Sequence, residues 1–201
     1  AAVSPTESAP RVKRASDLPY TLTTVLMLDN SLSIGANLQN VKDAAKALVD
    51  QADTDAAGFP AGNTGNQQIA VWTFNEGVTQ VQAPTSDVAS LKSAIDSIGL
   101  GSGSTNLYGA VIEGVDQWTT SYTTEGVEQG VMVLLSDGDD TRGVHTLQDA
   151  LDARGTKSVI SVLVNPDDQQ TGQETLTQLG NKDYIELTSF ENLTQEFVKI
   201  Q

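Results

Sequence analysis

Stretches of consecutive hydrophobic residues alternate along the chain with stretches in which hydrophobic residues recur every three or four positions. The first type is typical of strands buried on both faces of a sheet, and the second of helices with one apolar face. Their alternation predicts parallel strands joined by crossover helices. The predicted strands are Thr23–Asp29, Gln68–Phe74, Val78–Gln82, Gly130–Ser136, Ser158–Val164 and Tyr184–Leu187.

The helical pattern is clearest after the first strand. There, Leu38, Val41, Ala45 and Leu48 follow one another at spacings of three and four residues, which places them on one face of a helix. The next predicted helix begins after Asp87, whose side chain suits a helix cap. The helices expected after Asp87 are 88–98, 107–118, 147–153, 175–179 and 190–200.

One short connection breaks the alternation of strands and helices. Asn75–Gly77 is expected to form a hairpin turn after the second strand. The following segment, Val78–Gln82, alternates polar and hydrophobic residues, as an antiparallel strand at the edge of a sheet does. The pattern therefore predicts an α/β fold whose sheet is mostly parallel with one antiparallel edge strand.

The first residues of the chain differ from the rest. Residues 1–16 show no periodicity and contain two prolines, so we expect a flexible leader or linker before a single domain over 17–201. Within this leader, residues 11–14 resemble a basic processing site, although a solvated linker explains them more simply. The chain has no apolar run of about 18 residues, so we expect no transmembrane segment.

Composition narrows the function. Lys and Arg total 11 against 26 Asp and Glu, so the net charge is −15, which argues against nucleic acid as a partner. With no cysteine and one histidine, His145, the chain cannot form a disulfide, a thiolate nucleophile or a sulfur-based zinc site. We expect His145 to lie on the surface or cap a helix. The composition is typical of a secreted or surface-displayed prokaryotic protein.

Three loops carry oxygen-bearing side chains at the ends of predicted elements. Asp29 ends the first strand and Ser31 and Ser33 follow it, Thr105 follows a glycine-rich turn before a helix, and Asp137 follows a buried strand. The carboxyl ends of strands in open α/β sheets are where ligands bind. Carboxylates and hydroxyls are hard oxygen donors, which suit a cation such as Mg²⁺. If the two strands are neighbours, the loops meet around one point.

With these motifs in this order and spacing, the sequence resembles the von Willebrand factor type A domain over roughly residues 20–200. The resemblance implies a Rossmann-like three-layer sandwich, with a six-stranded sheet of five parallel strands and one antiparallel edge strand and with helices on both faces. It also implies a metal-ion-dependent adhesion site. Carried over position by position, the ligands of this site are Asp29, Ser31, Ser33, Thr105 and Asp137.

The resemblance implies that the cation is Mg²⁺ or Mn²⁺, and Ca²⁺ is a third candidate. The cation is held partly through water and accepts an acidic residue of a protein partner. Two carboxylates roughly neutralise a divalent ion, and neutral hydroxyls leave it electrophilic toward an incoming acid. The family further implies that Thr105 and Asp137 exchange direct and water-mediated contact as the last helix, 190–200, moves.

Simpler interpretations exist for single motifs. Alone, the loop at Asp29 is an ordinary turn with a helix cap, and only its combination with Thr105 and Asp137 favours a metal site. The pair Asp139 and Asp140 could extend the site or bind Ca²⁺, but a solvated turn is the better interpretation because no calcium loop follows. The glycines of 99–103 follow a helix and precede no Gly-Lys-Ser/Thr, which is not typical of a nucleotide site.

Three classes of function remain open at this stage. The first, which we favour, is a metal-dependent protein-binding or adhesion module at a cell surface or outside the cell, with no enzymatic activity. The second is a metal-dependent hydrolase or phosphoryl-transfer enzyme, which is disfavoured because no Lys or Arg adjoins the site motifs. The third is a structural part of a larger surface assembly, such as a pilus or adhesin, in which the metal site is incidental.

Overall fold

The sheet is built around β1 (Tyr20–Asp29), which pairs in parallel with β2 (Gly65–Phe74) on one side and with β5 (Val127–Ser136) on the other. The structure is a computed structural model and describes residues 18–58, 65–165 and 170–200. The other strands are β3 (Val78–Thr85), β4 (Ser121–Tyr122), β6 (Ser158–Val164) and β7 (Asp183–Leu187). The strand order is β3-β2-β1-β5-β6-β7, and β4 pairs with β5 outside this path.

The pairing confirms a mostly parallel sheet with an antiparallel edge strand. The strands β2, β1, β5, β6 and β7 are parallel, and β3 pairs antiparallel with β2. The expected hairpin turn joins β2 to β3, and in it the N–H of Asn75 donates to the carbonyl of Gly77 at 3.0 Å. The seventh strand, β4, was not predicted, because two residues in a polar segment carry no recognisable pattern.

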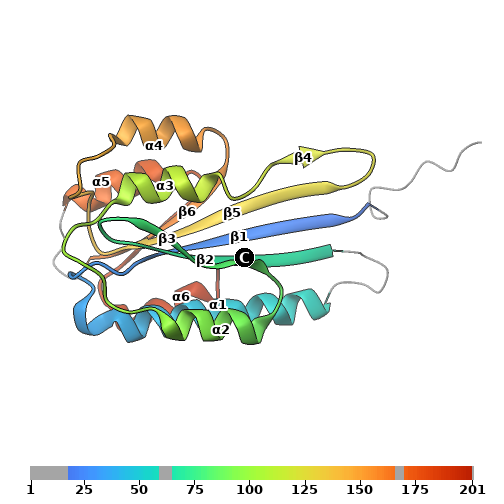
Figure 1. The fold of residues 1–201 in the computed structure, drawn as a ribbon, viewed down its shortest axis with the longest axis horizontal. Helices are drawn as coiled ribbons and strands as arrows, with labels where there is room; N and C mark the ends of the chain where they lie inside the picture. The colour runs from blue at the N-terminus through green and yellow to red at the C-terminus, as the bar shows by residue number, and fades with distance from the viewer. Residues whose placement is uncertain (1–17, 59–64, 166–169, 201) are drawn as a thin grey trace, which may run out of the picture.

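Helices cover both faces of the sheet (Figure 1). One face carries α1 (Leu38–Gly58), α2 (Val88–Ser97) and α6 (Leu193–Phe197), and the other carries α3 (Leu107–Val115), α4 (Leu147–Arg154) and α5 (Gln170–Leu179). Two short 3₁₀ helices, η2 (Gly35–Asn37) and η3 (Phe190–Asn192), precede α1 and α6. None of these helices, in the ranges described, is long and apolar enough to cross a membrane.

Successive residues of β1 point to opposite faces and so divide the core in two. Leu26 and Leu28 pack against α1, α2 and α6, whereas Val25 and Met27 pack against α3, α4 and α5. All four side chains are fully buried, as expected for a strand covered on both sides. Trp72 and Trp118 also lie in the second cluster and are core residues.

Several helix boundaries differ from the predicted ones. The last predicted helix, 190–200, is divided into η3 and α6, and after Phe197 the chain continues with tight turns in which Lys199 and Ile200 bond to residues three positions earlier. The helix predicted over 107–118 ends at Val115, and α5 begins five residues before its predicted start. The predicted leader, 1–16, lies outside the described residues, and the domain boundary at 17 stays a prediction.

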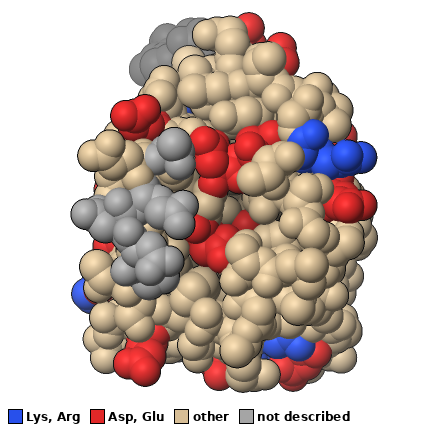
Figure 2. Space-filling model, turned by 90° about the vertical axis from the view of Figure 1, so that its left-hand side faces the viewer, with Lys and Arg blue, Asp and Glu red and all other residues tan. Residues whose placement is uncertain are grey.

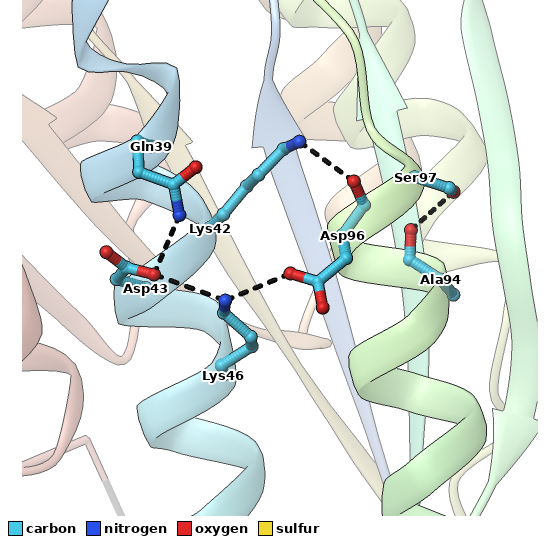
Figure 3. A network of polar contacts seen from close by, with 7 residues as sticks. All are labelled: Gln39, Lys42, Asp43, Lys46, Ala94, Asp96 and Ser97. Carbon is cyan, nitrogen blue, oxygen red and sulfur yellow. Dashed lines mark hydrogen bonds and ion pairs between the residues drawn. The ribbon is translucent and has the colours of Figure 1, made fainter.

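Between α1 and α2 lies a group of polar side chains that we call the α1–α2 network (Figure 3). Lys46 forms ion pairs with Asp43 at 3.2 Å and with Asp96 at 2.9 Å. Gln39 donates to Asp43 at 2.9 Å, and Lys42 donates to the backbone carbonyl of Asp96 at 3.0 Å. The network joins the two helices on the outside of the domain, so it supports packing without entering the core.

Candidate metal centre

The predicted site residues lie at the end of the molecule where the parallel strands finish, on the left of Figure 1. Leu28 of β1 pairs with Leu135 of β5, so Asp29 and Ser136 are the last residues of two neighbouring strands. The loops that follow these strands therefore start side by side. Figure 2 shows this end of the molecule face on, with acidic side chains gathered near its centre.

Asp29 is fully buried and is held by two neutral donors. One carboxylate oxygen, Oδ1, accepts the backbone N–H of Ser31 at 2.8 Å, and the other, Oδ2, accepts the hydroxyl of Ser136 at 2.7 Å. The contact with Ser136 crosses from β1 to β5 and fixes the direction of the carboxylate. Ser136 was not among the predicted site residues, because a serine at the end of a buried strand carries no chemical signature of its own.

Hydroxyl groups connect Asp29 to the second predicted acid. Ser31 Oγ and Ser33 Oγ share a hydrogen bond of 3.0 Å, and Ser33 Oγ donates to Asp137 Oδ1 at 2.9 Å. Ser31 is buried, whereas Ser33 is exposed and Asp137 is partly buried. Hydrogen bonds thus join four of the five predicted residues into one chain across the ends of β1 and β5.

Thr105, the fifth predicted residue, is buried and joins the same region through its backbone. Its N–H donates to Thr141 Oγ1 at 2.8 Å, and its carbonyl accepts the N–H groups of Thr141 at 2.9 Å and Arg142 at 3.1 Å. No hydrogen bond among the described residues joins the Thr105 hydroxyl to the other four. Nor does this hydroxyl cap α3, since Asn106 accepts the N–H of Gly109 in that role.

The carboxyl groups of Asp29 and Asp137 form no ion pair with any described residue. Burial raises the pKa of Asp29 to about 6, hydrogen bonds from Ser31 and Ser136 lower it in part, and the charge of Asp137 adds to the increase. Burial also raises the pKa of Asp137, against the hydrogen bond from Ser33. Two acids withdrawn from solvent and surrounded by hydroxyls fit the donor set of a hard divalent cation.

A pair of asparagines, which we call the Asn30–Asn75 clasp, joins the loop after β1, the turn between β2 and β3, and the glycine-rich loop. Asn75 Nδ2 donates to Asn30 Oδ1 at 3.0 Å, and Asn30 Nδ2 donates to the carbonyl of Gly99 at 2.9 Å. The backbone of the glycine-rich loop is fastened as well, since the N–H of Gly101 donates to the Asn30 carbonyl and the N–H of Asn106 to the Asn75 carbonyl, both at 2.7 Å.

The clasp explains why Gly101 is a glycine. A Cβ at this position would lie 2.2 Å from Asn75 Nδ2 and 3.1 Å from the Asn30 carbonyl oxygen, so a side chain would push the loop away. Neither asparagine was predicted to belong to the site. Each directly follows a buried strand, and this position on two neighbouring strands was the available signal.

The remaining acids of the third loop have a structural role. Asp140 accepts the N–H of Tyr108 at the start of α3 at 3.2 Å and the N–H of Gly143 at 2.8 Å, and Asp139 accepts the N–H of Asp140 at 2.7 Å. The bond from Tyr108 joins the loop to α3, and the other two bonds lie within the loop. Across the described residues, no group of three or more His, Asp or Glu side chains is arranged to hold a metal. Any cation here therefore has two carboxylates and hydroxyl groups available.

His145 is partly buried and precedes Thr146, which caps α4 by accepting the N–H of Asp149 at 3.2 Å. A capping role for His145, one of its two predicted roles, is therefore wrong, because Thr146 occupies that position with a reciprocal bond from Asp149.

A sequence model of the von Willebrand factor type A domain family matches residues 24–199. Because the match covers most of the chain, the protein belongs to this family. No curated protein matches the chain. The family assignment accounts for the observed order of strands and for the position of the three loops at one end of the sheet.

Solved structures share the fold. Proximal thread matrix protein 1 from the mussel byssus aligns with a TM-score of 0.70 at 19% identity over 92% of this chain and 48% of its own length. The von Willebrand factor domain of the type V pili tip protein Mfa5 from Porphyromonas gingivalis aligns with a TM-score of 0.70 at 11% identity, over 92% of this chain and 94% of that one. The chain thus spans about half the length of the mussel protein.

A second structure of the mussel protein is described as having a zinc-occupied MIDAS motif, the abbreviation for a metal-ion-dependent adhesion site. It aligns with a TM-score of 0.69 at 20% identity over 92% of this chain and 48% of its own length. At such identities the likeness shows a common fold alone.

Proposed function

We propose that the protein is a metal-dependent protein-binding or adhesion module. Its cation is held by Asp29, Ser31, Ser33, Thr105 and Asp137 and coordinates an acidic residue of a partner protein. The single observation that carries this proposal is the pair of carboxyl groups, Asp29 and Asp137, which neutral hydroxyls link and which no Lys or Arg of the described residues neutralises. A bound divalent ion would offer a Lewis-acidic position to an incoming carboxylate.

The residues of the proposed site have different roles in holding such an ion. Asp29 and Asp137 supply the negative charge, and Ser31 and Ser33 supply neutral oxygens that leave part of the positive charge uncompensated. The Asn30–Asn75 clasp keeps the glycine-rich loop against the loop after β1, and the backbone of Thr105 bonds to Thr141 and Arg142 on the loop of Asp137. Preorganisation of this kind lowers the entropic cost of gathering ligands from three separate loops.

Mg²⁺ is the proposed ion, with Mn²⁺ and Ca²⁺ as the other candidates. Hard carboxylate and hydroxyl oxygens match these cations, and a set of only two carboxylates suits Mg²⁺, which keeps several waters. Zinc prefers nitrogen and sulfur ligands, yet the zinc-occupied site of the mussel protein makes it a necessary competitor in any titration. Coupling of Thr105 and Asp137 to movement of α6 stays a prediction.

We further propose that the module acts outside the cell or at the cell surface, as part of a larger assembly. This location is supported by the kinds of protein that share the fold, a byssus matrix protein and a pilus tip protein. An enzyme is disfavoured, since the side chains around Asp29 are hydroxyls already engaged with each other or with the acids. The second candidate function is a structural module of such an assembly with an incidental metal site, which the same relatives support.

Calorimetric titration of the purified protein with Mg²⁺ and Mn²⁺ tests the metal site directly. Asp29→Ala is expected to reduce metal affinity by at least about a hundredfold, because one of two charged ligands is lost. Asp96→Ala is the matched control, since it removes an acid from the α1–α2 network and should leave metal affinity unchanged. Circular dichroism should show a folded domain for both variants. Equal metal affinity in wild type and Asp29→Ala would refute the site.

Partner binding is tested with a phage-displayed library of random peptides. The immobilised protein should enrich peptides containing Asp or Glu in Mg²⁺, and EDTA should release them, because the carboxylate reaches the protein through the ion. Asp29→Ala should enrich none of these sequences. A protein that binds Mg²⁺ tightly but enriches no metal-dependent peptide would support the structural alternative instead.

A further inference from the structure

We propose that Leu32, Leu100 and Val144 form an apolar rim around the metal centre, and that the partner presents its acidic residue flanked by apolar side chains. This inference rests on the proposed function, because it describes the surface surrounding the proposed metal site. Each of the three residues lies on one of the three loops that carry the predicted ligands. The rim defines the class of partner more narrowly than the metal alone can.

The distribution of exposed hydrophobic residues points to this end of the molecule. Five large hydrophobic side chains are exposed in the described part of the chain, and Leu32, Leu100 and Val144 expose 55%, 44% and 59% of their surface. The other two, Tyr122 and Val198, lie on β4 and after α6. None of the three rim residues belongs to either core cluster, so packing of the fold does not explain them.

Leu32 is the rim residue nearest to the ligands, since it stands between Ser31 and Ser33 in the sequence. Its side chain extends toward the glycine-rich loop, where its Cδ1 atom would lie 3.9 Å from a Cβ placed on Gly103. A carboxylate that approached a cation at Ser31 and Ser33 would therefore bring its neighbouring side chains against Leu32.

The hydrogen bonds of the loops hold the other two rim residues at the same end. Leu100 adjoins Gly101, whose N–H donates to the Asn30 carbonyl directly after β1. Val144 adjoins Gly143, whose N–H donates to Asp140 at 2.8 Å and whose φ of 66° lies in the left-handed region. These anchors make the rim a fixed surface of the folded domain.

Two kinds of flank beside the partner's acid compete for this face, basic and apolar. The acidic side chains near its centre attract Lys and Arg, and the backbone N–H groups that Asp139 and Asp140 accept do not cancel their charge. The leucines and valine of the rim offer a basic side chain no hydrogen bond, so a Lys or Arg placed against them would lose water without gaining a partner. Apolar flanks gain by removing these exposed side chains from water.

The peptide selection described above tests the inference when the flanking positions are read as well as the acid. We expect enriched peptides to carry Leu, Ile, Phe or Trp within two positions of Asp or Glu. Metal-dependent peptides whose acids are flanked by Ser, Gly, Lys or Arg would overturn the rim and leave the proposed function standing. Basic peptides that bind equally well in EDTA would overturn both proposals.

A triple variant, Leu32→Ser, Leu100→Ser and Val144→Ser, isolates the contribution of the rim. It should bind the selected peptide at least about tenfold more weakly while its Mg²⁺ affinity, measured with the metal alone, stays within about twofold. Tyr122→Ser is the matched control, because Tyr122 is 67% exposed but lies on β4, away from the site loops. Unchanged peptide affinity in the triple variant would overturn the inference.

If the triple variant loses Mg²⁺ affinity, the pair Leu100→Ser and Val144→Ser replaces it, since this pair leaves the loop between Asp29 and Ser33 intact. Weakened peptide binding in the pair, with Mg²⁺ affinity preserved, supports the rim. Peptide binding equal to wild type in the pair refutes it.

Discussion

Acidic side chains lie in two contrasting settings on this protein, the α1–α2 network and the candidate metal centre. In the network, Lys46 lies between Asp43 and Asp96, so the negative charges have a cation of the chain itself beside them (Figure 3). In the candidate metal centre, Asp29 and Asp137 contact hydroxyl and N–H groups, which donate hydrogen bonds but carry no charge. Both settings contain two acids, but only those of the network have a positively charged side chain beside them.

The pKa of Asp43 in the network is lowered, whereas the pKa values of Asp29 and Asp137 are raised. A hydrogen bond from Gln39, followed by the contacts with Lys46, lowers the pKa of Asp43, and the bonds to Asp96 and Asp43 raise the pKa of Lys46. Burial raises the pKa of Asp29 and of Asp137. Asp43 and Lys46 therefore favour each other's ionised form, whereas burial of Asp29 and Asp137 disfavours theirs.

Among the variants that test this contrast, Asp29→Asn is expected to change the free energy of unfolding most. The substitution keeps the shape of the side chain and removes its charge. Without metal, Asp29 has a folded-state pKa of about 6 against the ordinary value of 3.8, so its contribution to stability is present below about pH 4 and is lost as the pH rises through 6. At pH 7 the substitution should raise the free energy of unfolding by as much as about 3 kcal/mol, and at pH 4 by less than about 1 kcal/mol.

Urea unfolding at the two pH values, in EDTA and in Mg²⁺, measures this difference. Saturating Mg²⁺ should stabilise the wild type and leave Asp29→Asn unchanged, because a ligand stabilises only the protein that binds it. An equal difference in the free energy of unfolding between wild type and Asp29→Asn at both pH values, measured in EDTA, would contradict this prediction. That result would show that the buried charge does not cause the difference in stability.

A smaller effect is expected from Asn75→Ala, which breaks the clasp while leaving every predicted ligand in place. Loss of the bond to Asn30 should lower the free energy of unfolding by about 1 kcal/mol and weaken Mg²⁺ binding by about tenfold, since the glycine-rich loop is no longer fastened. Calorimetric titration and urea unfolding give the two values.

Gly101→Ala provides the companion variant for the clasp. Its new Cβ should disturb the wild type, where Asn75 Nδ2 would be 2.2 Å away. It should be tolerated better in combination with Asn75→Ala, because the Asn30 carbonyl oxygen at 3.1 Å then becomes the nearest obstacle. Strictly additive effects of the two substitutions would show that the loops are not coupled through Asn75.

The smallest effect is expected from Asp96→Ala in the α1–α2 network. The side chain of Asp96 is 60% exposed, and Lys42 bonds to its backbone carbonyl, which the substitution retains. The free energy of unfolding should fall by about 0.5 kcal/mol, and the difference should shrink at about 1 M NaCl as the ion pair is screened. A loss of several kcal/mol in thermal or urea unfolding would place this exposed pair among the main supports of the fold.

The sequence pattern predicted the strands well because burial on both faces leaves an uninterrupted apolar run, as in Val25–Leu28. It failed where pairing depends on the backbone alone. The start of β5, Val127–Gln129, contains one apolar residue and two polar ones, yet it pairs with both β1 and β4. Such residues join the sheet because a neighbouring strand offers them hydrogen bonds, and that neighbour is not visible in the local sequence.

The candidate site was predictable only through its motifs. Spacing and order singled out Asp29, Ser31, Ser33, Thr105 and Asp137, and the structure links four of them by hydrogen bonds, while their role as metal ligands stays a prediction. Asn30, Asn75 and Ser136 could not be singled out in this way. Their importance depends on which loops are neighbours in space, and an asparagine after a strand is otherwise typical of an ordinary turn.

The central position of β1 has a mechanical consequence. A pull applied between the residues that precede Tyr20 and a partner held at Asp29 would run along the whole of this strand, a distance of about 30 Å. Its hydrogen bonds to β2 and β5 lie across that direction on both sides, so tension would load them in shear and they would have to yield together. A central strand loaded in this way would help the domain to stay folded under tension.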